Sequence, residues 1–235
     1  MKPIKKPSLL LLPIAILLFA HPLKASESLA ASPADATPQN NSPSGEGAGQ
    51  SVLDKTKQVI RVGTFETDMP SRRCVVLVFT LPDASAPANL KAAHFSVRLF
   101  SKRFEPTYDL DLWALRVAPP EEAEVQPADY GVGPKPEGPE SQVLLEASFA
   151  TPSSPDQRLT CSTDAAASLA KFLQDHWIPG GKLFVRINPA NPPDFGARAD
   201  GGTTDQGYDF GSADRTDGEV PNIDIEPGSS PAKSR

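Results

Sequence analysis

The sequence has few of the residues on which many catalytic sites depend. Its 235 residues include 2 cysteines and 3 histidines, and only His94 and His176 lie beyond the N-terminal segment. It contains no Gly-x-Ser-x-Gly motif, no His-Glu-x-x-His motif and no glycine-rich phosphate-binding loop. A Ser-His-Asp triad therefore has few candidates, and these absences favour a non-catalytic protein.

Catalysis by carboxylates alone is an alternative that this shortage leaves open. One protonated acid and one ionised base are enough to cleave a glycosidic bond. The chain has 29 acidic residues, and the sequence does not show which of them lie close together. A carboxylate-dependent polysaccharide-cleaving enzyme therefore stays among the possibilities.

Residues 1–25 have the pattern of a secretory signal peptide. Three lysines precede an apolar run over residues 9–20, and Ala25 offers a small residue for cleavage. The run is shorter than the roughly 20 residues that a membrane-spanning helix needs. We expect export to the periplasm or the extracellular space, without stable membrane insertion; a retained membrane anchor is the alternative.

The charge of the exported chain restricts its partners. The net charge of the full chain is −6, and removal of residues 1–25 takes away four lysines and no acid, which leaves about −10. Nucleic acids and anionic lipids require clustered lysine and arginine, so we expect neither as a partner. Polysaccharides, cations and envelope proteins remain.

The two cysteines, Cys74 and Cys161, both lie in the exported part. Thiols generally oxidise after export, so we expect one disulfide between them. The alternative is two free, buried thiols.

Both ends of the exported chain have the composition of disordered segments. Residues 26–50 are nearly all small or polar and contain a single leucine, and residues 227–235 are similar. Such segments cannot bury enough apolar surface to offset the entropy lost on ordering. We therefore expect a disordered spacer over 26–50, a folded domain over 51–226 and a disordered tail over 227–235.

The folded domain has the pattern of a mostly β protein. Apolar and polar residues alternate, as in half-buried strands, over 59–62, 74–81, 95–99, 108–117, 143–149, 183–187 and 222–225. One helix is predicted from Thr163 to Trp177, because Leu169, Phe172 and Leu173 recur at helical spacing before Pro179. Many strands with a preference for antiparallel pairing predict an antiparallel β-sandwich with one short α-helix.

Several motifs resemble, in their order along the chain, those of a group of secreted bacterial domains. They include Phe79-Thr80-Leu81-Pro82-Asp83, Asp111-Leu112-Trp113-Ala114-Leu115-Arg116 and the closing Val220-Pro221-Asn222-Ile223-Asp224-Ile225. The order is similar to that of DNRLRE-like, galactose-binding-like modules over residues 58–226. This resemblance implies an exported jelly-roll or galactose-binding-like sandwich without catalytic activity.

One predicted strand carries a candidate carbohydrate site. Asp109, Asp111 and Trp113 alternate with leucines and are therefore predicted to lie on one strand face. Carboxylates accept hydrogen bonds from sugar hydroxyls, and an indole packs against the C–H face of a sugar ring. The alternative is that Asp111 pairs with an arginine and Trp113 is buried.

A glycine-rich run over residues 194–217 carries candidate calcium ligands. Asp205, Asp209 and Asp214 follow Asp200 there, and calcium binds six to eight oxygens. The alternative is a solvated acidic loop.

We therefore expect an exported, non-catalytic binding module that binds carbohydrate or associates with the cell surface, with structural calcium as a possible cofactor. The alternative from another class is a structural or protein-interaction domain of the envelope.

Overall fold

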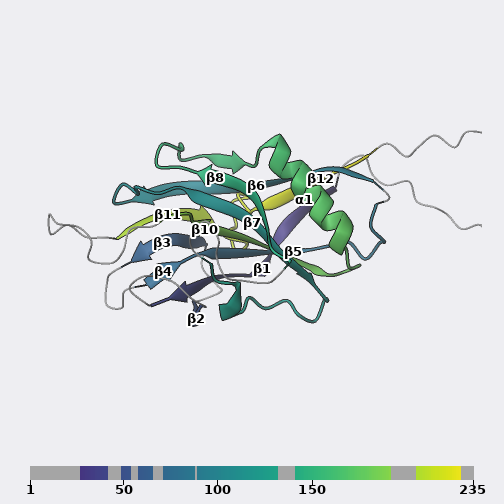
Figure 1. The fold of residues 1–235 in the computed structure, drawn as a ribbon, viewed down its shortest axis with the longest axis horizontal. Coiled ribbons are helices and arrows are strands. Elements are labelled where there is room, and N and C mark those ends of the chain that lie inside the picture. The colour runs from purple at the N-terminus through teal and green to yellow at the C-terminus, as the bar shows by residue number, and fades with distance from the viewer. Residues whose placement is uncertain are drawn as a thin grey trace, which may run out of the picture.

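The computed structural model describes residues 27–41, 49–53, 58–65, 71–87, 89–131, 141–191 and 205–228. These residues form twelve strands, one α-helix and one short 3₁₀ turn, and every strand pairing is antiparallel (Figure 1). The predicted mostly β, antiparallel sandwich with one helix is confirmed. The predicted signal peptide lies outside the described residues.

The elements follow one another along the chain with a single helix near the end. In order they are β1 (Glu27–Asn40), β2 (Ser51–Leu53), β3 (Val59–Phe65), β4 (Ser71–Arg73), β5 (Val75–Thr80), β6 (Leu90–Arg103), β7 (Leu110–Ala118), the 3₁₀ turn η1 (Pro127–Asp129), β8 (Val143–Ala150), β9 (Arg158–Thr160), α1 (Thr163–His176), β10 (Lys182–Pro189), β11 (Gln206–Gly211) and β12 (Asn222–Pro227).

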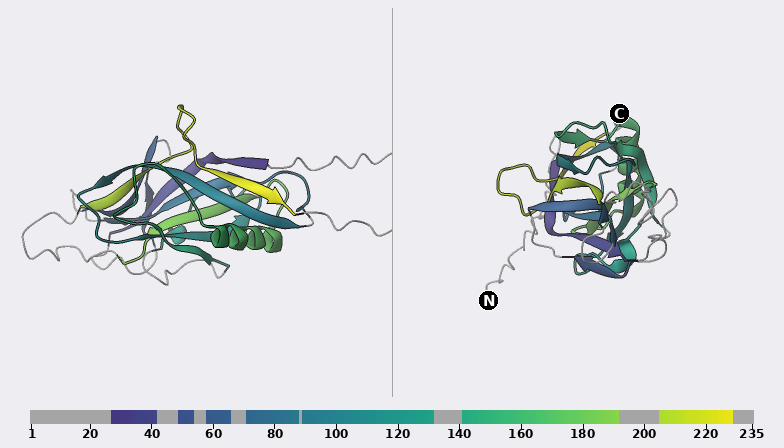
Figure 2. Two further views of the ribbon diagram at one scale, coloured as in Figure 1. Left: turned by 90° about the horizontal axis from the view of Figure 1, so that it is seen from above. Right: turned by 90° about the vertical axis from the view of Figure 1, so that its left-hand side faces the viewer.

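The strands form two layers that share β1. Neighbouring strands run in the order β12-β6-β11-β3-β4-β1-β5-β10-β7-β8, and β12 also pairs with β1. The six strands β1, β12, β6, β11, β3 and β4 are therefore paired in a closed ring. Strand β5 pairs with β1 outside this ring, and β10, β7 and β8 continue the sheet from β5. Seen along the long axis, the strands surround a common interior (Figure 2).

Strand β1 corrects the predicted disordered spacer. Its residues 27–30 pair with β12, residues 31–36 pair with β5 around a bulge, and residues 37–40 pair with β2 and β4. Pro33 is exposed within this bulge, where a missing N–H is tolerated. Composition predicted disorder because these residues bury little apolar surface, but strands distant in the sequence supply their backbone partners.

The predicted helix is confirmed in α1. The Ser162 hydroxyl accepts a hydrogen bond from the Ala165 N–H at 3.3 Å, and the helix ends just before Pro179. Its buried face, which includes Leu169 and Leu173, packs on β6 and β8 (Figure 1). Strands β2, β4 and β9 were not predicted, because three residues are too few to show a period.

The layer formed by β5, β10 and β7 is buried on both faces. Leu77 and Phe79 belong to the main core, whereas Val76, Val78 and Phe184 belong to a second apolar cluster on the opposite face. A strand buried on both faces has a nearly continuous apolar sequence, as residues 75–79 do.

The predicted disulfide is wrong, because both thiols are free and buried. Cys74 lies between β4 and β5, with its Sγ 3.9 Å from the Pro38 carbonyl oxygen. The Cys161 Sγ accepts from the Phe95 N–H at 3.3 Å. Burial raises the pKa of both thiols, that of Cys74 to about 11. Each cysteine therefore acts as a small apolar residue in its own part of the core.

Candidate functional site

The predicted carbohydrate site on β7 does not form an open surface. The Asp111 carboxylate is buried and accepts from the Ser148 N–H at 3.0 Å, while Asp109 accepts from the Ser148 hydroxyl at 2.6 Å. Burial raises the pKa of Asp111, and the Ser148 N–H opposes this. The two carboxylates thus stabilise the irregular pairing of β7 with β8, where Ser148 has a φ of 56°.

Trp113 is buried, as in the alternative to the sugar site. It pairs with Arg186 across β7 and β10 on the same face as Asp111, so the predicted alternation is present. That face is covered by the segment 119–131, whose Val125 packs in the second cluster with Trp113. Only 7% of Trp113 is exposed. Alternation identified the face but could not show what covers it.

The three predicted calcium ligands are not brought together. The Asp209 carboxylate pairs with Arg61 at 3.2 Å and Arg103 at 2.9 Å, so two guanidinium groups already compensate its charge. Asp205 lies four residues away, which is about 13 Å along a strand. Asp214 lies beyond β11, close to Asp35. Within the described ranges, no group of three or more His, Cys, Asp or Glu side chains could hold a metal ion.

A polar groove crosses the outer face of β9, β6, β12 and β1. Thr160 is opposite Ser96, and Ser96 is opposite Asn222, so one row of short polar side chains crosses three strands. The groove has a volume of about 500 Å³. Small-molecule sites typically have about 300–1,000 Å³. Its lining consists of Ser28, Ala30, Ser96, Arg158, Thr160, Gly218, Val220, Asn222 and Asp224.

Arg158 fixes the middle of the polar groove. Its guanidinium donates to the Ser96 hydroxyl at 2.9 Å and to the Asn222 side-chain oxygen at 2.8 Å. It also donates to Glu219 and to the Val220 carbonyl, each at 3.2 Å. A planar group with several donors holds its acceptors in one geometry. The wall formed by residues 218–220 is therefore tied to the strands.

The Asn222 side chain is fully hydrogen-bonded within the polar groove. Its amide donates to Ser28 at 3.3 Å and to one Asp224 oxygen at 3.1 Å, and its oxygen accepts from the Ser96 hydroxyl at 2.5 Å as well as from Arg158. Thr160 is exposed, and its hydroxyl has no hydrogen-bond partner among the residues that the structure describes. The groove therefore offers the Thr160 hydroxyl and the Asp224 carboxylate, which can accept further hydrogen bonds, beside a row of side chains that are already bonded to one another.

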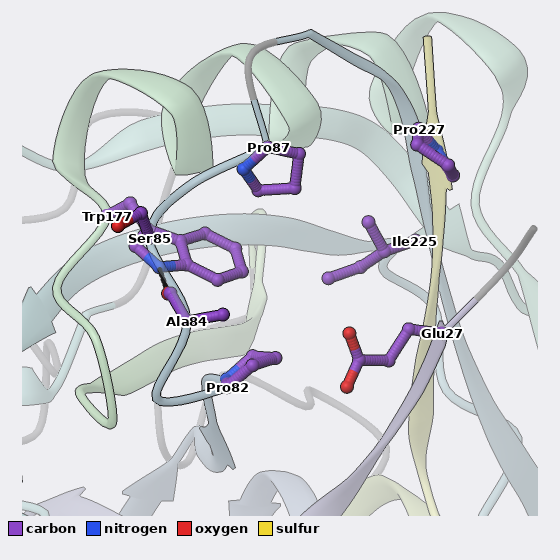
Figure 3. A pocket seen from close by; sticks show the side chains of 8 residues that line it. All are labelled: Glu27, Pro82, Ala84, Ser85, Pro87, Trp177, Ile225 and Pro227. Atoms are coloured by element: carbon purple, nitrogen blue, oxygen red, sulfur yellow. Dashed lines mark hydrogen bonds between the residues drawn. The ribbon is translucent and has the colours of Figure 1, made fainter. Parts of the chain in front are cut away.

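An apolar pocket lies on the other side of the ribbon formed by β1 and β12 (Figure 3). Glu27 and Ile225 line it, whereas their neighbours Ser28 and Asp224 line the polar groove. The Trp177 indole N–H donates to the Ala84 carbonyl at 3.0 Å, which fixes the ring in the pocket wall. The pocket volume is about 30 Å³. That is about the volume of one water molecule in the liquid, so no sugar ring fits inside.

Sequence reasoning missed the polar groove because its contacts are non-local. Ser96 and Asn222 lie in strands that were predicted, and their outward positions follow from alternation. Arg158 lies in a three-residue strand and contacts Asn222 across 64 positions of the chain. No local pattern indicates such a contact.

Comparisons with known proteins add no relative to this description. No family model matches the chain, and no curated protein sequence matches it. The resemblance to DNRLRE-like modules therefore stays a prediction.

None of the helices in the described ranges is long and apolar enough to cross a membrane.

Proposed function

We propose that this protein is an exported, non-catalytic binding module whose polar groove binds a neutral or weakly charged polysaccharide. The observation that carries the proposal is the row of Thr160, Ser96 and Asn222, fixed by Arg158. Sugar hydroxyls both donate and accept hydrogen bonds, and the groove presents both kinds of partner. Export itself rests on the pattern of residues 1–25.

The charge of the chain favours a neutral ligand. An exported chain near −10 repels acidic polymers at long range. Within the groove, the single guanidinium is already paired with Glu219, so it provides no free positive charge for an anion. A neutral polysaccharide is not repelled by the chain and does not have to compete with Glu219 for the Arg158 guanidinium.

The groove composition also sets the expected affinity. No aromatic side chain lines it, so hydrogen bonds supply the binding energy. Each contributes about 0.5–1.5 kcal/mol net. Four such bonds correspond to a Kd of about 1 mM for a short oligosaccharide. A polymer that engages several copies of the protein at once would be retained more strongly.

A matched pair of threonine variants tests this proposal. Thr160→Val removes the free hydroxyl in the groove, and Thr163→Val makes the same change at the exposed start of α1. Affinity electrophoresis through gels containing neutral glucans, galactans or mannans should show retardation of the wild type and of Thr163→Val, with weaker retardation of Thr160→Val. Equal mobility of all three in every gel would reject the groove as a glycan site.

One observation favours the alternative, a protein-interaction domain of the envelope. Val143 and Leu144 are adjacent, 38% and 42% exposed, and lie on β8, which ends the strand order. A terminal strand with exposed apolar residues suits pairing with an extended segment of a partner. Under this alternative, Leu144→Lys would abolish co-purification with an envelope protein, and no glycan would retard the wild type.

A further inference from the structure

Asp35 on β1 is a buried carboxylate that has no cationic partner in the described part of the chain. It is 1% exposed and lies within the bulge between Ser32 and Ala36. One of its oxygens, Oδ2, accepts from the Ala213 N–H at 3.1 Å. The other, Oδ1, is buried and has no hydrogen-bond partner among the described residues.

Asp214, in the loop after β11, also has a carboxylate oxygen without a hydrogen-bond partner within the described ranges. This oxygen, Oδ2, is buried. Asp214 directly follows Ala213, whose N–H donates to the Asp35 carboxylate, so this bond brings the two acidic residues onto adjoining segments. The charge of Asp214 also raises the pKa of Asp35. The two residues belong to segments far apart in the chain, namely β1 and the loop over residues 212–221.

Among the residues that the structure describes, no positive charge is paired with either carboxyl group. The strand partners of β1 here are Val76 and Val78 on β5, which are apolar. The Arg215 guanidinium pairs with Asp217 and lies 4.0 Å from the centre of the Phe100 ring. Burial, followed by the charge of Asp214, raises the pKa of Asp35 to about 7, although the Ala213 N–H opposes this.

Two neighbouring ionised carboxylates are costly in a buried site, and one proton relieves the cost. We propose that Asp35 and Asp214 share one proton, so that the Asp35 carboxyl donates a hydrogen bond to the Asp214 carboxylate and fastens the 212–221 loop to β1. Loss of this proton to the solvent at alkaline pH leaves two like charges and loosens the loop.

The fastened loop forms one wall of the polar groove. Glu219 and Val220 belong to it, and both accept hydrogen bonds from Arg158. Loosening the loop removes these acceptors and weakens ligand binding as pH rises. This last consequence rests on the proposed function, whereas the shared proton does not.

The direction of the pH effect is unusual for a carboxylate. Because folding raises the pKa of Asp35 from 3.8 to about 7, the folded state holds a proton that the unfolded state has lost between these values. The stabilisation is complete below pH 4 and is lost as pH rises to 7. Between these pH values, deprotonation of this one group should lower the folding equilibrium constant by up to about tenfold per pH unit.

Urea unfolding of the purified exported chain from pH 4 to 8.5 tests the proposal without any glycan. Asp35→Asn places an amide donor opposite Asp214, so this variant should keep the loop fastened and lose the pH dependence. Asp217→Asn, in the same loop but exposed, should retain the wild-type pH profile. An Asp35→Asn profile that matches the wild type would overturn the proposal.

Carbon-13 NMR of the aspartate carboxyls in the wild type gives a second readout, which does not depend on the folding of any variant. Asp35 should titrate near pH 7; titration below pH 5 would contradict the shared proton. A calcium-dependent gain in wild-type stability that EDTA reverses and Asp35→Asn abolishes would show that a cation occupies the site instead of a proton.

Discussion

Two sheet faces of this protein each contain an arginine that organises its neighbours, and they differ in what covers that arginine. Arg186 is fully buried and donates to Asn188, the Asp129 carbonyl and Gln142 at 2.9–3.2 Å. The side chain of Arg158 is 33% exposed and faces the polar groove. The two arginines thus make similar hydrogen bonds in different settings. Arg186 only stabilises the fold, because a loop covers it, whereas no described residue covers the groove around Arg158, so a ligand could reach it.

The same contrast explains why the sequence alone placed its candidate sugar site on a face that is covered. Trp113 and Asp111 have the residue types of a sugar site, and their alternation on β7 is correct. The segment 119–131, which has no strand or helix pattern in the sequence, covers them. Whether a face is open depends on the path of such a loop, and proline-rich loops have no periodic pattern from which to read that path.

The largest expected effect comes from removing the strand that both faces share. Deletion of residues 27–40 removes the partner of β12 in the polar groove and the partner of β5 beside the second cluster. We expect the loss of a cooperative unfolding transition, measured by circular dichroism during heating. An unchanged melting temperature would mean that β1 does not belong to the fold.

The next largest effect is the difference in stability between alanine variants of the two arginines. Arg186→Ala leaves three acceptors without this donor, two of them on the buried residues Asn188 and Asp129, and should cost about 3–5 kcal/mol in the free energy of unfolding. Arg158→Ala breaks partly solvated bonds and should cost about 1 kcal/mol. Urea unfolding of both variants measures this difference. Equal costs would show that the cover over Arg186 is not tight.

A smaller effect is expected for Trp113→Phe. The Trp113 indole N–H has no hydrogen-bond partner among the described residues, so the cost is that of a modest cavity, about 1–2 kcal/mol. Retention on glycan gels should be unchanged, because the ring does not reach the polar groove. Loss of retention with unchanged stability would restore Trp113 as a ligand-binding residue.

The smallest effect is expected for reduction of the protein. Because Cys74 and Cys161 are free, dithiothreitol should leave the melting temperature unchanged. In urea without reductant, iodoacetamide should alkylate both thiols, as read by intact mass. A single disulfide-linked species would contradict this.

How much of the structure the sequence predicts depends on how far apart along the chain the interacting residues lie. Alternation and helical spacing are local, and they predicted β3, β5, β6, β7, β8, β10, β12 and α1. Strand β1 is rich in alanine, serine and proline and depends on distant partners, so composition misassigned it. The polar groove and the proposed pairing of Asp35 with Asp214 join residues from opposite ends of the chain, and no local pattern indicates them.

The central claim is that the open face, and not the covered face, binds the ligand. Two-dimensional ¹⁵N NMR of the wild type, titrated with the neutral oligosaccharide that gives the strongest retardation as a polymer, tests it directly. We predict concentration-dependent shifts at the amides of Ser96, Thr160 and Asn222, with none at Trp113. Shifts confined to Trp113 and its neighbours, or no shifts at millimolar ligand, would contradict the claim.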